Sequence, residues 1–364
     1  MGHLSDGQTS LMRAEAMEQL GVNLIRFDAR KFLDQRSFVE RRLSDTFERS
    51  PLLHLYNQKL LDAANAIRPT VIWFDKPKFV TGNTIDQLKA NGAFLIHYTP
   101  DPYFGYGGYQ TRTTTSNFSK FDLFITTKSY ELDDYRKFGT TIYMPHGYCD
   151  RVHRPVPVSE SERVDFGFVG SWEPRREAFM ERAASDGLSV RIWGLGWQHL
   201  VSGRAGLRTR LRLRKMSGGH PFSIRKSSLL SKHIQSGEVC GNDYAGALSA
   251  SRISPGLLRT SLYPDQHTTR TFEIPACGSM LLAERTSEHE EFFDEDKEAV
   301  FFETEEEMVE KAVWYTQHPT ERQRVTEAGR RRCLASGYSY RDRLETALMD
   351  VAKSMGVRTP RLAH

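Results

Sequence analysis

Short apolar runs alternate with helical stretches along most of the chain, and this alternation is the feature that most constrains its fold. In the first half a helical pattern at 54–67 and another at 85–91 lie between such runs. Strands that alternate with helices predict a parallel α/β sheet with helical crossovers, and ligands gather at the carboxyl ends of its strands. The expected strands of the first half are 71–74, 93–98, 123–126 and 141–144.

The N-terminal segment predicts a loop, a helix and a strand. Residues 1–10 form a glycine-containing loop, a helical pattern runs from 9 to 20, and the apolar stretch 22–27 is expected to be a strand. In a dinucleotide-like domain such a loop follows a central strand, and nothing precedes it in this sequence. We expect that the recorded start lies downstream of a first strand, because a gap in the sheet leaves backbone groups unpaired. The alternative is a domain that tolerates its loss.

The second half begins after a linker. Residues 151–163 are rich in proline and charge, as in a segment between two domains. A strand and a glycine turn that contains Gly170 restart at 164, and Arg176 opens the next helix. The following strand leads into a second glycine turn, where Gly194 is expected to approach a nucleotide base.

The segment 263–284 reads as loop, short helix and buried strand. The hydroxyls of Thr268, Thr269 and Thr271 can cap a helix N-terminus, Pro275 is expected within the first turn, and Gly278 ends the helix. The apolar run that follows predicts a strand buried on both faces. Units of this kind bind anions.

The start of this helix is suited to a nucleotide sugar. A helix N-terminus carries partial positive charge and free N–H groups, and Arg270 lies beside it, so a diphosphate is favoured there. Asp265 and Glu273, separated by seven residues, add acceptors for ligand hydroxyls. The alternative is that Glu273 only complements the helix dipole and Asp265 is a loop acid.

The sequence resembles the CgeB-like (spore maturation protein type) branch of the group 1 glycosyltransferases. The resemblance covers nearly the whole chain and is strongest from 240 to 340. It implies the GT-B fold, with two Rossmann-like α/β domains at 1–150 and 164–337 that face each other across a cleft. A last helix, 338–356, is expected to cross back to the first domain. The segments that carry the resemblance are 265–278, 282–289 and 297–302.

The resemblance also assigns roles on the donor side. The larger clan places one acid near the donor sugar and a second on the nucleotide ribose, which match Asp265 and Glu273; the first is usually Glu, so Asp265 is a shortened version. The clan clamps the diphosphate with an Arg after the glycine and a Lys five residues later. Here Ser171 departs from that pattern, and Arg176 keeps the second cation.

The acceptor side is expected at the end of the second strand of the first domain. His97 and Asp101 lie there, and the resemblance supports Asp101 because an acid recurs after this strand in CgeB-like proteins. The glycine-rich loop that follows contains Tyr103, Tyr106 and Tyr109, whose aromatic faces and hydroxyl tips suit a sugar. A packed surface turn, and a histidine satisfied at a strand end, are the alternatives.

Residues 204–215 form a basic insertion whose arginines largely alternate with other residues, without a clean amphipathic helix. We expect a solvated surface, which is still the best site for a partner such as an anionic lipid surface. Nucleic acid is not expected, because the net charge is only +4.

The composition is that of an ordinary two-domain protein. The chain has 364 residues, of which 39% are hydrophobic and 26% charged, and no apolar run is long enough to cross a bilayer. We therefore expect a cytoplasmic location. The four cysteines show no paired spacing, and the acids at 294–296 lie in a charged loop, so no metal is expected.

These observations, together with the resemblance, predict a metal-independent glycosyltransferase that needs no cofactor and uses a nucleotide sugar as substrate. The resemblance implies that the transfer is retaining. The acceptor is a polysaccharide, a lipid-linked compound, a protein or a small molecule. In this hypothesis Arg176 and Arg270 stabilise the leaving diphosphate, while Asp265 and His267 orient the donor sugar and Asp101 faces the acceptor. The alternatives are a GT-B epimerase or hydrolase, and a non-catalytic scaffold that uses the basic insertion.

Overall fold

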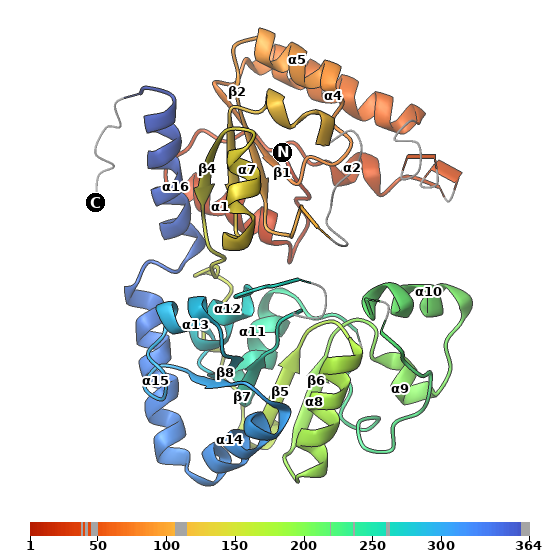
Figure 1. Ribbon diagram of the computed structural model, residues 1–364, viewed down its shortest axis with the longest axis vertical. Helices are drawn as coiled ribbons and strands as arrows, with labels where there is room; N and C mark the ends of the chain where they lie inside the picture. Colours follow the sequence, from red (N-terminus) through yellow and green to blue (C-terminus); the bar gives the residue numbers. More distant parts are fainter. Residues whose placement is uncertain are drawn as a thin grey trace. The chain divides into compact units, whose positions relative to one another are not determined.

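The protein consists of two compact units in this computed structural model (Figure 1). The first contains Met1–His146 and Tyr340–His364, and the second contains Gly147–Ser339. The expected linker at 151–163 therefore belongs to the second unit, and the last helix belongs to the first. The structure describes residues 1–37, 39–40, 43–44, 50–105, 115–218, 220–235, 237–259 and 263–357.

The first unit is built on a parallel sheet with the order β1-β2-β3-β4. All four strands predicted from the apolar runs are confirmed, and Phe74 on the first strand pairs with His97 on the second. Because the strands are parallel, their carboxyl ends share one edge. The strands are β1 (Val71–Asp75), β2 (Phe94–Thr99), β3 (Leu123–Thr126) and β4 (Thr140–Tyr143).

Helices cover the strands of this unit. The longest, α4, starts where the Ser50 hydroxyl accepts the Leu53 N–H and Pro51 occupies the first turn. Its apolar stripe enters the core, which includes the fully buried Tyr56, while α16 packs against α1. The helices are α1 (Thr9–Gln19), α2 (Arg30–Leu33), α4 (Pro51–Ile67), α5 (Gly82–Ala90), α7 (Leu132–Arg136) and α16 (Tyr340–Ser354), with the short turns η1 (Phe118–Lys120) and η2 (Ser129–Glu131).

The strand predicted at 22–27 was wrong, because these residues form no strand in the described part of the chain. The backbone next to β1 is instead supplied by Met1, whose N–H donates to the Trp73 carbonyl at 2.7 Å. The Met1 carbonyl accepts the Asp75 N–H at 2.8 Å. These contacts use two backbone groups of β1, the Trp73 carbonyl and the Asp75 N–H, that a neighbouring strand would otherwise pair. The apolar side chains of 22–27 line a pocket of about 510 Å³.

The second unit holds a parallel sheet with the order β6-β5-β7-β8-β9. The chain steps from β5 to β6 on one side and returns to β7 on the other, so the strand order reverses between β5 and β7. In open α/β sheets a ligand crevice lies at the carboxyl ends beside such a reversal. The strands are β5 (Val164–Val169), β6 (Val190–Trp193), β7 (Ser251–Gly256), β8 (Met280–Glu284) and β9 (Val300–Phe302).

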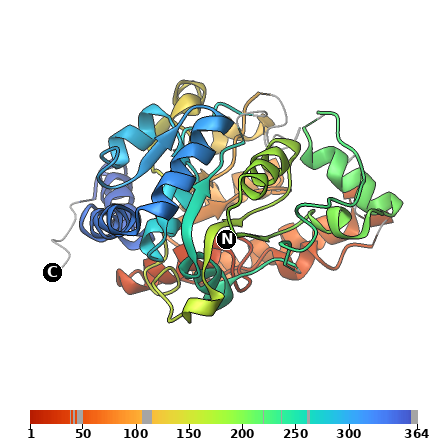
Figure 2. The same cartoon turned by 90° about the horizontal axis from the view of Figure 1, so that it is seen from below.

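Helices cover both faces of this sheet (Figures 1 and 2). One core packs Phe179 of α8 and Met308 of α14 against the sheet, and the other packs Leu248 of α11 and Phe272 of α12. The helices are α8 (Pro174–Ser185), α9 (Gln198–Ser202), α10 (Leu207–Met216), α11 (Gly241–Ser249), α12 (Arg270–Ala276), α13 (Ser287–Phe292), α14 (Glu305–Gln317) and α15 (Pro319–Ala335).

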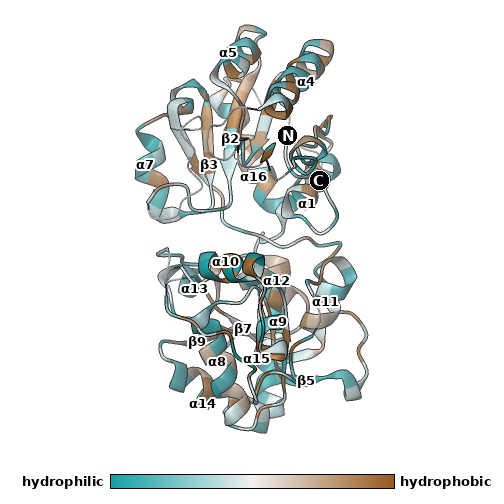
Figure 3. Cartoon of the chain, turned by 90° about the vertical axis from the view of Figure 1, so that its right-hand side faces the viewer, coloured by the Kyte–Doolittle hydropathy of each residue, from teal (hydrophilic) through white to brown (hydrophobic). Residues whose placement is uncertain are grey.

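Most of the basic insertion is a helix whose residues are largely exposed, in keeping with the predicted solvated surface. Its residues 207–216 form α10, which is held by the fully buried Leu213, while Leu207 and Leu211 are 73% and 60% exposed. Figure 3 shows α10 mainly in the teal of hydrophilic residues, interrupted by brown. Leu213 and the partly buried Met216 pack into the core, and periodicity alone did not show this because the arginines are dispersed around the helix. No helix of the described residues is long and apolar enough to span a membrane.

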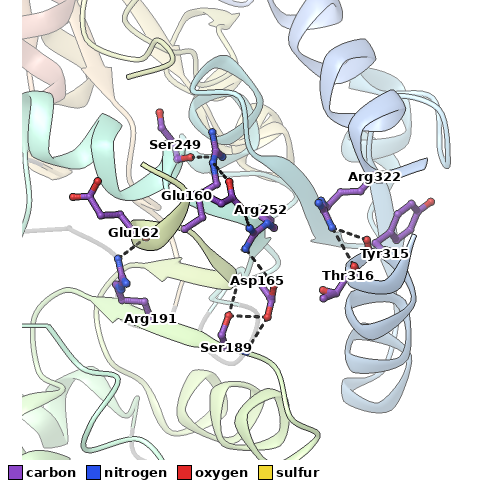
Figure 4. A network of polar contacts seen from close by, with 11 residues as sticks. Glu160, Glu162, Asp165, Ser189, Arg191, Ser249, Arg252, Tyr315, Thr316 and Arg322 are labelled. Atoms are coloured by element: carbon purple, nitrogen blue, oxygen red, sulfur yellow. Dashed lines mark hydrogen bonds and ion pairs between the residues drawn. The ribbon is translucent and has the colours of Figure 1, made fainter. Parts of the chain in front are cut away.

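A polar network holds the amino-terminal edge of the second sheet (Figure 4). Asp165 at the start of β5 accepts the Ser189 hydroxyl at 2.7 Å and lies 3.5 Å from the Arg252 guanidinium of β7. Arg191 of β6 donates to the Glu162 carbonyl at 2.9 Å. These contacts join three strands at the edge opposite their carboxyl ends, so we assign them a structural role.

Candidate active site

Helix α12 begins without the predicted threonine cap. Thr269 occupies the N-cap position with helical backbone angles and makes no side-chain cap bond. Its hydroxyl instead donates to the Glu273 carboxylate at 3.0 Å. Thr271 is buried, and its hydroxyl lies 2.9 Å from His289 Nε2. The cap prediction was wrong, because Glu273 of the same helix takes one hydroxyl and His289 outside the helix binds the other. The Thr268 hydroxyl makes no hydrogen bond to a described residue.

The same helix ends as predicted, at Gly278. This glycine has φ +79°, its N–H donates to the Pro275 carbonyl, and the Ser279 N–H donates to the Ile274 carbonyl. This pair of bonds is a Schellman motif, which needs a left-handed residue. Pro275 lies in the last turn rather than the first, because the helix has only seven residues.

Glu273 is a buried carboxylate with three neighbours. One oxygen accepts the Tyr244 hydroxyl and the Thr269 hydroxyl, and the other lies 3.7 Å from His153 Nε2. His153 Nδ1 accepts the Cys149 N–H at 2.9 Å, which leaves the ring proton on Nε2, facing Glu273. Burial lowers the pKa of His153 and keeps it neutral. The carboxylate is thereby fixed, with one oxygen accepting both hydroxyls and the other facing His153.

Arg176 joins the two loops at the strand-order reversal. It donates to the Ser171 carbonyl after β5 at 3.0 Å and to the Leu257 carbonyl after β7 at 3.1 Å. Burial and the neighbouring guanidinium groups of Arg270 and Arg259 lower its pKa to about 9. The Nε atoms of Arg176 and Arg270 make no hydrogen bond to any described residue. Crowded cations of this kind favour a bound anion.

Two acids that the sequence did not reveal pair with arginines here: Glu173 with Arg259 and Arg176, and Glu284 with the neighbouring Arg175. Glu173 lies 2.6 Å from the Arg259 Nε, and Glu284 lies 2.7 Å from an Arg175 nitrogen. Glu284 also accepts the Leu258 N–H at 2.6 Å. Glu284 is the last residue of β8 and Arg259 closely follows β7, so their place at strand ends was the available signal.

Gly170 and Gly194 bring two turns together. Gly194 has φ +141°, and a Cβ on it would lie 2.1 Å from the Gly170 carbonyl oxygen. The same carbonyl accepts the Trp197 indole N–H at 2.8 Å, and Trp197 is fully buried. The structure therefore gives Gly194 a packing role at the end of β6. Its predicted approach to a base stays a prediction.

His267 and Asp265 lie in the segment before α12, and both are buried. His267 Nδ1 contacts the Glu288 carboxylate, and its ring packs against Phe272 and Phe292 at 5.8 and 5.3 Å. A carboxylate partner fixes the tautomer of an imidazole and raises its basicity. Their predicted contact with the donor sugar stays a prediction.

In the first unit, Asp101 pairs with Lys76. His97 is 1% exposed and lies among aromatic rings, with Tyr103 at 5.6 Å between ring centroids. Neither of its ring nitrogens makes a hydrogen bond to a described residue, so it is not the satisfied histidine that one reading expected. Burial lowers its pKa to about 3. Tyr106 and Tyr109 lie outside the described residues.

Glu131 positions the start of the loop that begins at Tyr103, and the sequence analysis did not identify this role of Glu131. Its carboxylate accepts the N–H groups of Tyr103 and Phe104 at 2.7 and 2.8 Å. Burial raises the pKa of Glu131 to about 7. Within the parts of the chain that the structure describes, no group of three or more His, Cys, Asp or Glu residues is arranged to hold a metal ion.

Comparison with known proteins agrees with this geometry. Residues 175–349 match the Glycosyl transferase-like family model. This segment includes Arg176, Arg259, Arg270 and Glu273. No curated protein matches the chain in sequence.

Solved structures with the same fold cover almost the whole chain. Sucrose-phosphate synthase from Thermosynechococcus elongatus has a TM-score of 0.63 at 13% identity, over 98% of this chain and 95% of its own. A glycosyltransferase from Rickettsia africae has a TM-score of 0.63 at 10% identity, over 98% of this chain and 97% of its own. Anabaena HepE in complex with UDP-glucose has a TM-score of 0.61 at 10% identity, over 97% of this chain and 99% of its own. The chain has the GT-B fold. The predicted glycosyl-transferring enzyme is confirmed at the level of family model and fold.

Proposed function

We propose that this protein transfers a sugar from a nucleotide diphosphate donor to an acceptor hydroxyl, as a CgeB-like glycosyltransferase. The observation that supports this best is the group of Arg176, Arg259 and Arg270 beside the strand-order reversal of the second sheet. Fixed guanidinium groups stabilise the negative charge that develops on a departing diphosphate. The reaction then needs neither a metal ion nor a cofactor.

The buried carboxylate of Glu273 is proposed to bind the ribose. Its bonds to Tyr244 and Thr269 hold it before the ligand arrives, so little ordering is required on binding. Asp265 and His267 are proposed to orient the donor sugar. The acceptor hydroxyl forms the new bond to the anomeric carbon, and the nucleoside diphosphate leaves with the bonding electrons and takes up the proton. Retention is inferred from the family resemblance.

A uridine nucleotide is the first donor to test, since the similar HepE structure was solved with UDP-glucose. Asp101 and the loop that begins at Tyr103 are proposed to face the acceptor. We place the reaction in the cytoplasm, in keeping with a nucleotide-sugar substrate.

Thermal stability with UDP, GDP, ADP, CMP and their sugars tests the proposal on the full chain. A ligand at a hundred times its dissociation constant stabilises by about 2.7 kcal/mol, which is readily measured. We expect one nucleotide to raise the melting temperature of the wild type, and Glu273→Gln and Arg270→Gln to abolish most of the shift. Arg191→Gln is the matched control, because Arg191 lies in the network at the opposite edge. A folded wild type that responds to none of these ligands contradicts the proposal.

An epimerase or hydrolase of the same fold would use the same donor site. Product analysis with and without an acceptor distinguishes them, because sugar release that no acceptor changes indicates hydrolysis. A scaffold that works through the basic insertion predicts cellular function that survives Glu273→Gln.

The surface of α10 carries a second proposal, contact with an anionic lipid surface. Leu207 and Leu211 are exposed one helical turn apart. The helix also contains the cations Arg208, Arg210, Arg212, Arg214 and Lys215. Exposed leucines beside several cations suit the interface of a membrane with anionic headgroups.

A further inference from the structure

A pocket of about 310 Å³ lies at the carboxyl end of the first sheet, entirely within the first unit. Its walls come from the loop after β1, the start of α1 and the end of β2. Four cations and two acids line it, so the lining is net positive. These residues are Arg13, Arg36, Lys76, Lys78, Asp34 and Asp75.

The acids of the pocket are held by arginines. Asp75 accepts two hydrogen bonds from Arg13, at 3.0 and 2.6 Å, and Asp34 pairs with Arg30. Asp101, which lies nearby, pairs with Lys76. The carboxylates therefore orient particular cations rather than forming an acidic face.

The loop after β1 presents two lysines in a constrained conformation. Lys76 and Phe79 have φ of +55° and +69°, in the left-handed region that non-glycine residues rarely adopt. The Lys76 N–H is held by the Tyr98 carbonyl at 2.9 Å. Lys76 and Lys78 are both exposed, on either side of the buried Pro77. Strained backbone of this kind persists where its surroundings enforce it and is concentrated at ligand sites.

Asn57 of α4 holds this loop in its conformation through hydrogen bonds. Its amide donates to the Phe79 carbonyl at 2.9 Å and accepts the Thr81 N–H at 2.9 Å. Asn57 is 5% exposed. A buried side chain that binds both ends of the turn fixes where the two lysines lie.

Two buried polar side chains line the same pocket without full hydrogen bonding. His97 is 1% exposed and Arg13 is 2% exposed. The two ring nitrogens of His97 make no hydrogen bond to any described residue, and the same is true of Arg13 Nη1. Buried polar atoms are almost always paired in folded proteins, so polar atoms left this way in a pocket indicate a polar ligand.

We propose that this pocket is an acceptor subsite for a sugar that carries a phosphate or carboxylate group. The inference rests on the proposed glycosyl transfer and names its acceptor class. Guanidinium groups match the paired oxygens of these anions, and lysines add point charges. Tyr56, Phe79 and Tyr103 supply an aromatic wall that suits the face of a sugar ring.

Calorimetric titration of the full chain tests this subsite. The probes are glucose 6-phosphate, glucuronate, glucose and inorganic phosphate. We expect one of the two anionic sugars to bind and glucose to show no binding at the same concentration. Lys78→Gln should weaken that binding about tenfold, as expected for a charge-assisted contact. Lys59→Gln is the matched control, since Lys59 is an exposed lysine of α4 that does not line the pocket.

The outcomes separate the subsite from the proposed function. The subsite proposal is overturned if glucose or inorganic phosphate binds as tightly as the anionic sugars, or if no probe binds. It is also overturned if Lys78→Gln and Lys59→Gln weaken the binding of the anionic sugar equally. A chain that responds to a nucleotide but to neither anionic sugar keeps the proposed function and loses the subsite. Binding of an anionic sugar without any nucleotide response keeps the pocket and removes glycosyl transfer as its purpose.

Discussion

At the scale of single residues, the candidate site depends on buried polar groups that hold one another in place. Glu273 keeps its orientation through Tyr244 and Thr269, and Arg176 keeps its own through two backbone carbonyls. Groups fixed in this way need little rearrangement when a ligand binds, so a partner that never touches the ligand still affects affinity.

Removal of the Tyr244 hydroxyl tests this positioning. Tyr244→Phe leaves a buried carboxylate short of one charge-assisted bond, which is worth about 1.5–3 kcal/mol. We expect lower unfolding free energy and nucleotide affinity reduced about tenfold. Denaturant unfolding and nucleotide titration measure the two effects. Tyr338→Phe is the control, since its buried hydroxyl binds the Phe292 carbonyl and loss of stability there should leave nucleotide affinity unchanged.

His97 gives the stability of the chain a pH dependence. Burial lowers its pKa from 6.5 to about 3, so the unfolded chain takes up a proton below pH 6.5 that the folded chain does not. The contribution of this residue to stability is therefore fully present well above pH 6.5 and is lost as the pH falls toward 3. At pH 5 the loss is about 2 kcal/mol. We expect His97→Phe to show a smaller loss between pH 7 and 5 in urea unfolding. Equal losses in both proteins contradict this assignment.

At the scale of elements, the glycine turns at strand and helix ends determine how the loops of the site pack. Gly194 lies against the Gly170 carbonyl, whereas a Cβ on Gly278 would lie 3.4 Å from Pro155, within ordinary contact. The two glycines share a positive φ but differ in the space around them. Their substitution therefore separates steric overlap from backbone strain.

Alanine at these two positions should have unequal cost. We expect Gly278→Ala to lower the unfolding free energy by about 1 kcal/mol, from the left-handed backbone alone. Gly194→Ala should cost roughly 3 kcal/mol or more, because the backbone of the neighbouring turn must also move. Chemical denaturation of both variants measures the difference. Similar costs would show that the turn at Gly170 yields easily.

Helix α10 is the element whose surface can be tested directly. We expect the chain to sediment with vesicles that contain anionic lipid and not with neutral ones, and added salt to weaken the binding. A Leu207→Ser, Leu211→Ser double variant should lose this binding while it keeps its nucleotide response. Equal binding to neutral vesicles would contradict the charge argument. Leu229→Ser is the control, as an exposed leucine outside α10.

At the scale of the whole molecule, the sequence predicted what local patterns determine. The strand and helix alternation, the end of α12 at Gly278 and the buried strand β8 were read correctly, because an apolar run and a glycine stop act over a few residues. The absent strand at 22–27 and the threonine hydroxyls were misread, since the strand depends on long-range pairing and the hydroxyls bind other side chains, Glu273 of the same helix and the more distant His289. The acids Glu173 and Glu284 and the pocket near Lys76 were missed, because residues distant in sequence assemble them.

The first unit is built from both ends of the chain, and the second is one continuous stretch inserted between them. Where the stretch begins and ends, Tyr148 and Ser339 form a parallel bridge, and the Tyr148 N–H donates to the Tyr338 carbonyl. The entering and leaving segments thus meet at one point. A stretch whose ends already lie together loses little when it is cut free.

This predicts that residues 147–339 fold as a separate protein with the nucleotide response of the full chain. Its hydrophobic clusters lie within the stretch, so excision exposes no divided core. Melting temperature with and without the nucleotide checks this. A fragment that is folded but unresponsive would show that the first unit completes the donor site.

The arrangement has an evolutionary consequence. A gene that encodes an inserted body with adjoining ends can accept or exchange that body in one event, without disturbing the sequence order of the host. The host cannot be exchanged in the same way, because its two parts are separated along the gene. Under the proposed division of the two sites, donor specificity lies in one continuous segment that can be exchanged as a whole, whereas acceptor specificity lies in a unit built from two separate segments.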